Sequence, residues 1–84
     1  MKWQVILKKS ARKELEALPD HMMQKIYGEL KELSDNPFPQ QSKKLRGGAG
    51  YRLRVGDYRV LYDLDKDNFI INISAVRHRR EAYR

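Results

Sequence analysis

The sequence predicts an α+β fold in which two helices pack on one face of a mostly antiparallel sheet. The chain has 84 residues, the size of one domain with a single thin core. After a strand-like start, helical periodicity fills the part before residue 36, and two-residue alternation dominates after residue 50. We therefore expect residues 1–84 to form one domain in the order β-α-α-β-β-β.

The first part of the chain is predicted to form one strand and two antiparallel helices. Residues 3–7 alternate as a strand does. Ser10 is expected to cap the first helix, since its hydroxyl can accept a hydrogen bond from a backbone N–H group. Pro19 ends that helix and suits the start of the second, which ends at 35–37. Each helix has an apolar stripe: Ala11, Leu15 and Leu18, then Met22, Met23, Ile26, Tyr27, Leu30 and Leu33.

The second part is predicted to form the rest of the sheet. Segment 36–50 is irregular, although residues 43–46 could form a short strand. Residues 51–64 alternate on both sides of Gly56-Asp57, which suits a tight hairpin turn. Residues 69–76 are the most apolar strand and are expected inside the sheet, and residues 78–84 are expected to form a basic tail.

The composition argues against several classes of protein. There is no cysteine and there are only two histidines, so neither a disulfide framework nor a structural metal site is expected, and no cofactor is implied. No apolar run exceeds three residues, which argues against a membrane span. The strand-like pattern follows Met1 directly, so we expect no signal peptide and a cytoplasmic protein.

Positive charge is concentrated in the second half of the chain. The net charge is +7, and eight of the nine arginines lie after residue 42. A one-sided field of this kind favours a polyanionic partner, either nucleic acid or an acidic protein segment.

The hairpin is expected to gather arginines on one face. If the apolar residues of 51–62 face the helices, alternation places Arg52, Arg54 and Arg59 together on the opposite face. Like charges on neighbouring strands repel each other, which lowers stability. Because arginine suits planar, multidentate phosphate contacts, we interpret this face as an anion-binding surface. The alternative is a solvated polar face that is rich in arginine.

The tail adds further basic and aromatic groups that could fold over the same face: Arg77, His78, Arg79, Arg80, Tyr83 and Arg84. His78 is the one residue among them of a type suited to proton transfer, although a lone histidine is more often an ordinary surface residue. Tyr83 could pack against the domain or stack on a nucleic-acid base. Segment 47–50 is interpreted as a flexible turn, because it lacks the spacing of a phosphate-binding loop.

Three runs, at 44–47, 51–62 and 76–84, together resemble the RelE/ParE toxin superfamily, on its RelE side. The Leu-Pro step between the predicted helices also fits. The resemblance implies a toxin of a type II toxin–antitoxin pair that cleaves mRNA in the ribosomal A site and inhibits translation. It implies metal-independent attack by a ribose 2′-hydroxyl on the adjacent phosphate, leaving a 2′,3′-cyclic phosphate and a 5′-hydroxyl.

The resemblance also assigns roles to residues. It implies that Arg52 and Arg54 position RNA and promote attack, and that Arg59 stabilises phosphate charge. Arg79 would assist the leaving oxygen, with Arg77 or Arg80 as alternatives, and Tyr83 would stack on a base. The residues expected to bind RNA are Lys43, Lys44, Arg46, Arg77, Arg80 and Arg84.

The chain departs from the family pattern in its first basic pair. The best-known member has lysines where this chain has Arg52 and Arg54. Arginine is a poor proton acceptor, so Arg52 is better suited to electrostatic stabilisation. His78 then becomes the most plausible proton-transfer group, and the identity of the general base stays open.

Two other functions fit the same fold. One is ParE-like inhibition of DNA gyrase, and the other is a catalytically degenerate toxin that acts as a repressor partner. The expected partner in each case is a RelB-like antitoxin whose disordered segment folds on binding. Operator DNA would be reached only through that antitoxin, mRNA would be bound in the ribosome, and no membrane partner is expected.

Overall fold

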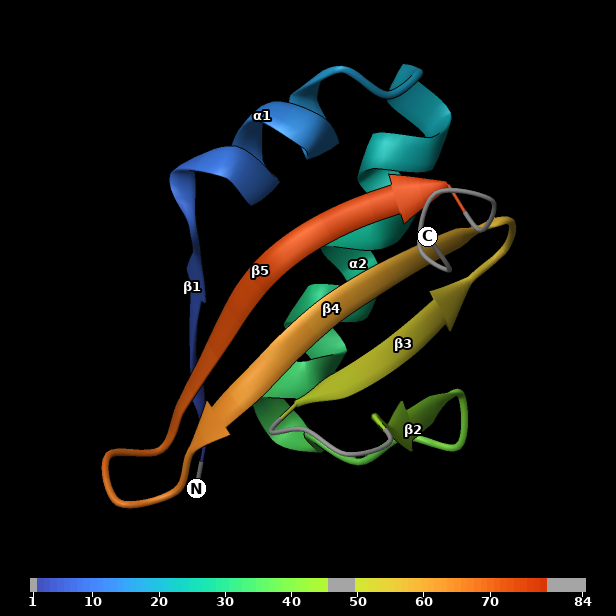
Figure 1. Ribbon diagram of the computed structural model, residues 1–84. Coiled ribbons are helices and arrows are strands. Elements are labelled where there is room, and N and C mark those ends of the chain that lie inside the picture. Colours follow the sequence, from blue (N-terminus) through green and yellow to red (C-terminus); the bar gives the residue numbers. More distant parts are fainter. Residues whose placement is uncertain (1, 46–49, 79–84) are drawn as a thin grey trace.

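The computed structural model describes residues 2–45 and 50–78, which form a five-stranded sheet and two helices (Figure 1). The sheet order is β1-β5-β4-β3-β2, in which β1 is parallel to β5 and the other neighbours are antiparallel. The predicted α+β class is confirmed, and the segment considered near 43–46 contributes the short edge strand β2. The elements are β1 (Gln4–Leu7), α1 (Lys9–Glu16), α2 (Asp20–Asp35), β2 (Ser42–Lys44), β3 (Tyr51–Val55), β4 (Tyr58–Asp65) and β5 (Ile70–His78).

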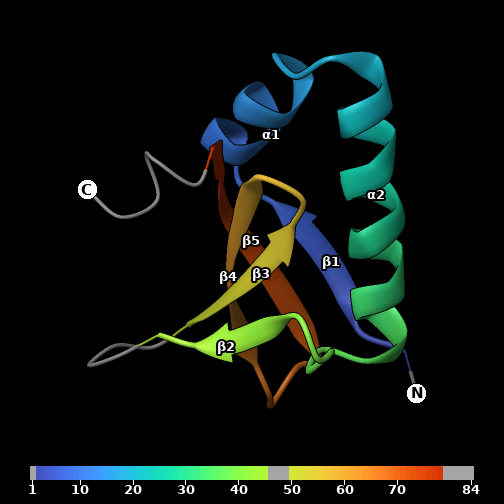
Figure 2. The ribbon, with the colours of Figure 1, turned by 90° about the vertical axis from the view of Figure 1, so that its right-hand side faces the viewer.

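The core lies between the helices and one face of the sheet. Helix α2 runs along that face, and α1 lies across the end of β5 (Figure 2). Strand β5 is an inner strand between β1 and β4, as its apolar sequence predicted. The core cluster comprises Ala11, Leu15, Ile26, Leu30, Leu33, Leu53, Val55, Val60, Tyr62, Ile71, Ile73 and Val76.

Two element boundaries differ from the sequence prediction. Ser10 does not cap α1, which already begins at Lys9 with Lys8 as its N-cap residue. The helix starts early because the Lys8 N–H still donates to the Ile73 carbonyl, 2.9 Å away, so the chain leaves the sheet directly into the helix. Strand β5 continues to His78 because β4 pairs with it as far as Tyr58. Arg77 and His78 are therefore strand residues and not part of a tail.

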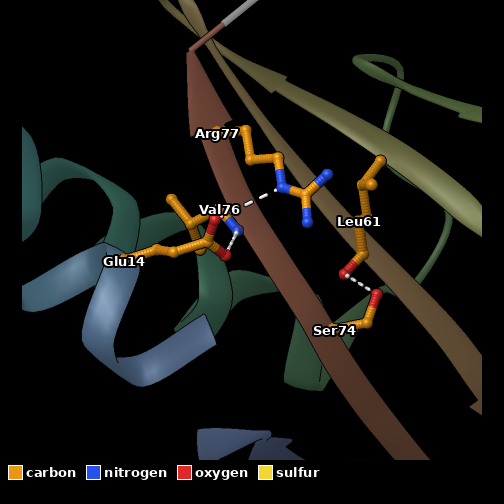
Figure 3. Close-up of polar contacts among 5 residues, drawn as sticks. All are labelled: Glu14, Leu61, Ser74, Val76 and Arg77. Carbon is orange, nitrogen blue, oxygen red and sulfur yellow. Dashed lines mark hydrogen bonds and ion pairs between the residues drawn. The ribbon is translucent and has the colours of Figure 1, made fainter. Parts of the chain in front are cut away.

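A β-bulge interrupts the pairing of β4 with β5. Leu61 is opposite Ala75, but Tyr62 is opposite Ile73, so Ser74 is an extra residue on β5. The Ser74 hydroxyl donates to the Leu61 carbonyl at 3.1 Å (Figure 3). An extra residue reverses the alternation of faces beyond it. Val76 therefore returns to the helix-bearing face.

Tyr62 links the centre of the sheet to the segment that follows α2. Its side chain is buried, and its hydroxyl donates to the Pro37 carbonyl at 2.8 Å. Its ring stacks on that of Tyr51, with centroids 5.5 Å apart. Burial raises the pKa of the Tyr62 hydroxyl above its ordinary value of 10.0.

Tyr62→Phe is expected to lower the free energy of unfolding by about 1–2 kcal/mol at neutral pH, because the Pro37 carbonyl loses its donor. The raised pKa means that Tyr62 stabilises the fold below pH 10.0, and that this contribution is lost as pH rises through the folded-state pKa. The difference in unfolding free energy between wild type and variant, measured by urea titration, should therefore become smaller above pH 10.0. Exposed Tyr27→Phe is the control. A gap that stays constant up to strongly alkaline pH would contradict this role.

Neither α1 nor α2, the helices of the described part of the chain, is long and apolar enough to cross a membrane.

Candidate nucleic-acid interface

Three adjacent strands carry a row of arginines on the face of the sheet opposite α2. Arg54 on β3 is directly opposite Arg59 on β4, and Arg59 is directly opposite Arg77 on β5. Arg52 lies on the same side of β3 and is opposite Lys43 on β2. We call these five residues the arginine face. Side chains at directly opposite positions have Cβ atoms roughly 4.5–5.5 Å apart, so the charges of the row lie close together.

Arg59 occupies the middle of the row and is the most enclosed of its members. It is only 8% exposed, whereas Arg54 and Arg77 on either side are exposed. One terminal nitrogen of Arg59 donates to the Tyr58 carbonyl at 3.3 Å. Its position on an inner strand explains the burial, because neighbouring side chains cover it from both sides. A buried charge acts through a lower effective dielectric than an exposed one.

A hollow of about 220 Å³ opens on the arginine face. The lining residues are Gln41, Lys43, Arg52, Arg54 and Arg59. The rim therefore carries four cationic side chains and one amide, which together suit an anionic group such as a phosphate.

Arg77 is held at the end of the row by an acidic residue of α1. Its Nε donates to Glu14 at 3.2 Å, and the other Glu14 oxygen accepts from the Val76 backbone N–H at 3.1 Å (Figure 3). The bulge at Ser74 puts Arg77 on this face, because uninterrupted alternation of the same residues from Ile73 onwards would place Arg77 on the helix-bearing side.

His78 and Lys44 lie apart from the arginine face. His78 is opposite Tyr58, and the two rings meet edge to face with centroids 5.4 Å apart. The same register puts His78 on the helix-bearing side, where it lines a separate cavity of about 270 Å³ together with Glu14. Lys44 is opposite Tyr51 and so also points to the side away from Arg52. The structure thus does not bring His78 to the arginines.

A family model described as the ParE toxin of the type II toxin–antitoxin system parDE matches residues 5–83. The chain belongs to this toxin family. The RelE/ParE resemblance inferred from three runs of sequence is confirmed.

Individual relatives of the toxin agree with this assignment. A candidate toxin called RelE1 from Methanocaldococcus jannaschii is 34% identical over 88 residues, covering 100% of this chain and 98% of the relative. The toxin–antitoxin complex RelBE2 from Mycobacterium tuberculosis contains a chain that is 28% identical, with a TM-score of 0.85; the match covers 94% of this chain and 100% of that one. The RelE–RelB complex from Pyrococcus horikoshii OT3 contains a chain that is 29% identical, with a TM-score of 0.84; the match covers 94% of this chain and 97% of that one.

Several predicted site residues of the toxin lie outside the described residues: Arg46, Arg79, Arg80, Tyr83 and Arg84. Within the described ranges, no group of three or more His, Cys, Asp or Glu side chains could hold a metal ion.

Two contributors were absent from the sequence prediction. Gln41 precedes β2 in a segment without periodicity, and its carbonyl accepts from the Arg54 N–H at 3.1 Å, which fixes it beside the hollow. Glu14 is 63 residues from Arg77 in sequence. Periodicity reports the faces of a single element, so it gives no signal for a contact between a helix and a distant strand edge.

Proposed function

We propose that this toxin is an endoribonuclease that cleaves mRNA in the ribosomal A site and thereby inhibits translation. The observation that carries the proposal is the row formed by Arg54, Arg59 and Arg77 beside a cationic hollow. A sheet that places like charges directly opposite one another loses stability, and a bound phosphate chain would offset this loss. Relatives at 27–34% identity are named RelE1 and RelE, on the side of the superfamily for which the sequence resemblance implies RNA cleavage.

In the proposed reaction, the ribose 2′-oxygen forms a bond to the adjacent phosphorus while the bond from phosphorus to the 5′-oxygen breaks. The 2′-hydroxyl gives up a proton and the leaving 5′-oxygen gains one, so the products are a 2′,3′-cyclic phosphate and a 5′-hydroxyl. Negative charge grows on the phosphate oxygens in the transition state. Arg59, which is central and buried, is suited to stabilise that charge, and Arg52 and Arg54 to orient the strand.

The roles of the remaining residues in this proposal follow the family resemblance. Arg79 would donate to the leaving oxygen, and Tyr83 would stack on a base. Arg77, which is held on the arginine face, is the alternative to Arg79 as the donor to the leaving oxygen. Lys43, at the rim of the hollow, would contact the RNA backbone.

Mapping the 5′ ends of transcripts after brief induction tests the proposal. New ends that carry a 5′-hydroxyl and fall within translated codons are the expected result. Purified ribosomes with a defined codon in the A site, compared with the same RNA alone, would show whether the ribosome is required. Intact mRNA at a toxic dose would contradict the proposal.

Gyrase inhibition is the second candidate, because the matching family is named for ParE. A supercoiling assay separates the two activities: blocked gyrase with intact mRNA would establish the second. A toxin that does neither, yet represses transcription together with its antitoxin, would be the degenerate form suggested by arginine at positions 52 and 54.

An antitoxin is the proposed protein partner, as in the RelE–RelB complexes of relatives. An apolar groove of about 460 Å³ runs beside the edge strand β1, with Val5, Leu7, Tyr27 and Leu30 in its lining. It suits the apolar side of an amphipathic antitoxin helix, while an extended segment could pair with a sheet edge. Acidic antitoxin residues would neutralise the arginine face, and operator DNA would be reached through the antitoxin.

The affinity for antitoxin is expected to fall as salt rises, because exposed charges contribute part of the binding free energy. Dissociation constants measured between about 0.05 and 0.5 M NaCl would show the slope. The Arg52→Gln, Arg54→Gln double variant should have a flatter slope than wild type. Affinity independent of salt would indicate a contact that is mainly apolar.

A further inference from the structure

The edge of β5 beyond residue 73 is covered by a helix instead of a strand. β1 pairs with β5 only from Ile70 to Ile73, because the chain turns into α1 soon after Leu7. Backbone N–H groups farther along that edge need other acceptors. Glu14 on α1 supplies one.

The Glu14 carboxylate accepts hydrogen bonds from two neighbouring donors of β5, one with each oxygen. Its bond from the Val76 N–H, 3.1 Å long, fixes the carboxylate relative to the strand. Its bond from Arg77 Nε, 3.2 Å long, then fixes the guanidinium relative to the carboxylate. Figure 3 shows the two terminal nitrogens of Arg77 turned away from Glu14. The side chain of Glu14 is 32% exposed, so the pair is partly shielded from water.

The row of arginines would not hold this arrangement by itself. Arg59 is directly opposite Arg77, and the repulsion between them favours rotamers in which Arg77 swings into solvent. Arginine side chains have large rotamer freedom, which costs free energy to restrict. A charge-assisted bond at Nε restricts it before any substrate arrives.

We propose that Glu14 is a positioning residue for RNA cleavage, which holds the Arg77 guanidinium beside Arg59 so that its terminal nitrogens meet the reacting phosphate. The inference rests on the proposed endoribonuclease function. Glu14 does not touch substrate itself and acts through Arg77.

Loss of the Glu14 carboxylate has two possible effects on cleavage, and they act in opposite directions. Removing a negative charge beside the arginine face raises its positive potential, which by itself tightens RNA binding. Removing a positioning contact slows the chemical step. Glu14→Gln separates the two, because its amide oxygen can still accept from Val76, while its amide nitrogen cannot accept from Arg77.

The test is single-turnover cleavage of mRNA on programmed ribosomes over a range of toxin concentrations. For Glu14→Gln we expect the rate at saturating toxin to fall about tenfold, with the half-saturating concentration unchanged or lower. The matched control is Glu16→Gln, which removes the same charge from an exposed position of the same helix and should leave the rate unchanged. In an Arg77→Ala background, Glu14→Gln should change the rate less than about twofold.

A second readout tests the contact without RNA. In NMR spectra of the free toxin, the Arg77 Nε–H signal should be resolved and slow to exchange in wild type, and lose both properties in Glu14→Gln. Urea unfolding of the two proteins measures any general loss of stability.

The outcomes separate this inference from the function on which it rests. A wild type that does not cleave mRNA overturns both. A wild type that cleaves, with a Glu14→Gln rate equal to that of Glu16→Gln, overturns the positioning role alone. So does a tenfold loss that persists in the Arg77→Ala background, because the effect would then be structural.

Discussion

Arg59→Ala is expected to slow mRNA cleavage by roughly 30- to 1000-fold, which corresponds to about 2–4 kcal/mol of activation free energy. Arg59 lies between Arg54 and Arg77 and is 8% exposed, so its charge is aimed at the middle of the arginine face and poorly screened by water. RNA binding should weaken far less, because the other cations of the face remain. Single-turnover assays on programmed ribosomes measure both quantities.

Two variants show whether the effect belongs to Arg59 itself. Arg12→Ala removes one positive charge from an exposed position on α1 and should leave cleavage unchanged. Arg59→Lys keeps the charge but loses the planar fork of donors, and is expected to be intermediate. The alanine variant should stay folded, because it also removes repulsion within the row. Near-normal cleavage by a folded Arg59→Ala protein would place the reaction elsewhere.

Insertion of a second serine directly after Ser74 is expected to cost about 3 kcal/mol or more of unfolding free energy and to abolish cleavage. If the bulge still holds only one extra residue, the insertion moves Val76 and Arg77 one position along β4, which turns Val76 out of the core and Arg77 towards the helix-bearing side. An arginine buried among apolar side chains carries a large desolvation cost. Either the end of β5 detaches from the sheet or the whole domain unfolds.

Urea titration followed by circular dichroism measures this loss, and Ser74→Ala is the control. The alanine variant keeps the bulge and loses only the bond to the Leu61 carbonyl, so about 1 kcal/mol is expected. Its cleavage rate should stay near that of wild type. An insertion variant as stable as Ser74→Ala would show that the number of extra residues at the bulge does not decide which face Arg77 occupies.

The sequence was sufficient to predict the β3–β4 part of the arginine face. Arg52, Arg54 and Arg59 lie in a regular hairpin whose two strands are joined by Gly56-Asp57, and regular alternation is visible in sequence. The inner position of β5 followed in the same way from its apolar residues. Short-range periodicity was enough because nothing interrupts these segments up to Leu61.

The parts of the fold and site that the sequence did not predict depend on interactions that periodicity does not encode. The bulge at Ser74 reverses the faces of β5, so it separates His78 from the arginines and brings Arg77 to them. Nothing about a serine in an apolar run marks it as an extra residue. The start of α1 at Lys9 similarly follows from a bond to Ile73, which is distant in sequence. Tertiary pairing outweighed the local capping preference of Ser10.

The position of β5 also has a consequence for when the toxin becomes active. β5 is the last strand of the described sheet in chain order, and it is the only strand of that sheet with which β1 pairs. During synthesis, β1 can therefore pair only after β5 has been made, and such long-range pairing is slow. The described sheet, and with it the arginine face, can therefore assemble only after nearly all of residues 2–78 have been synthesised.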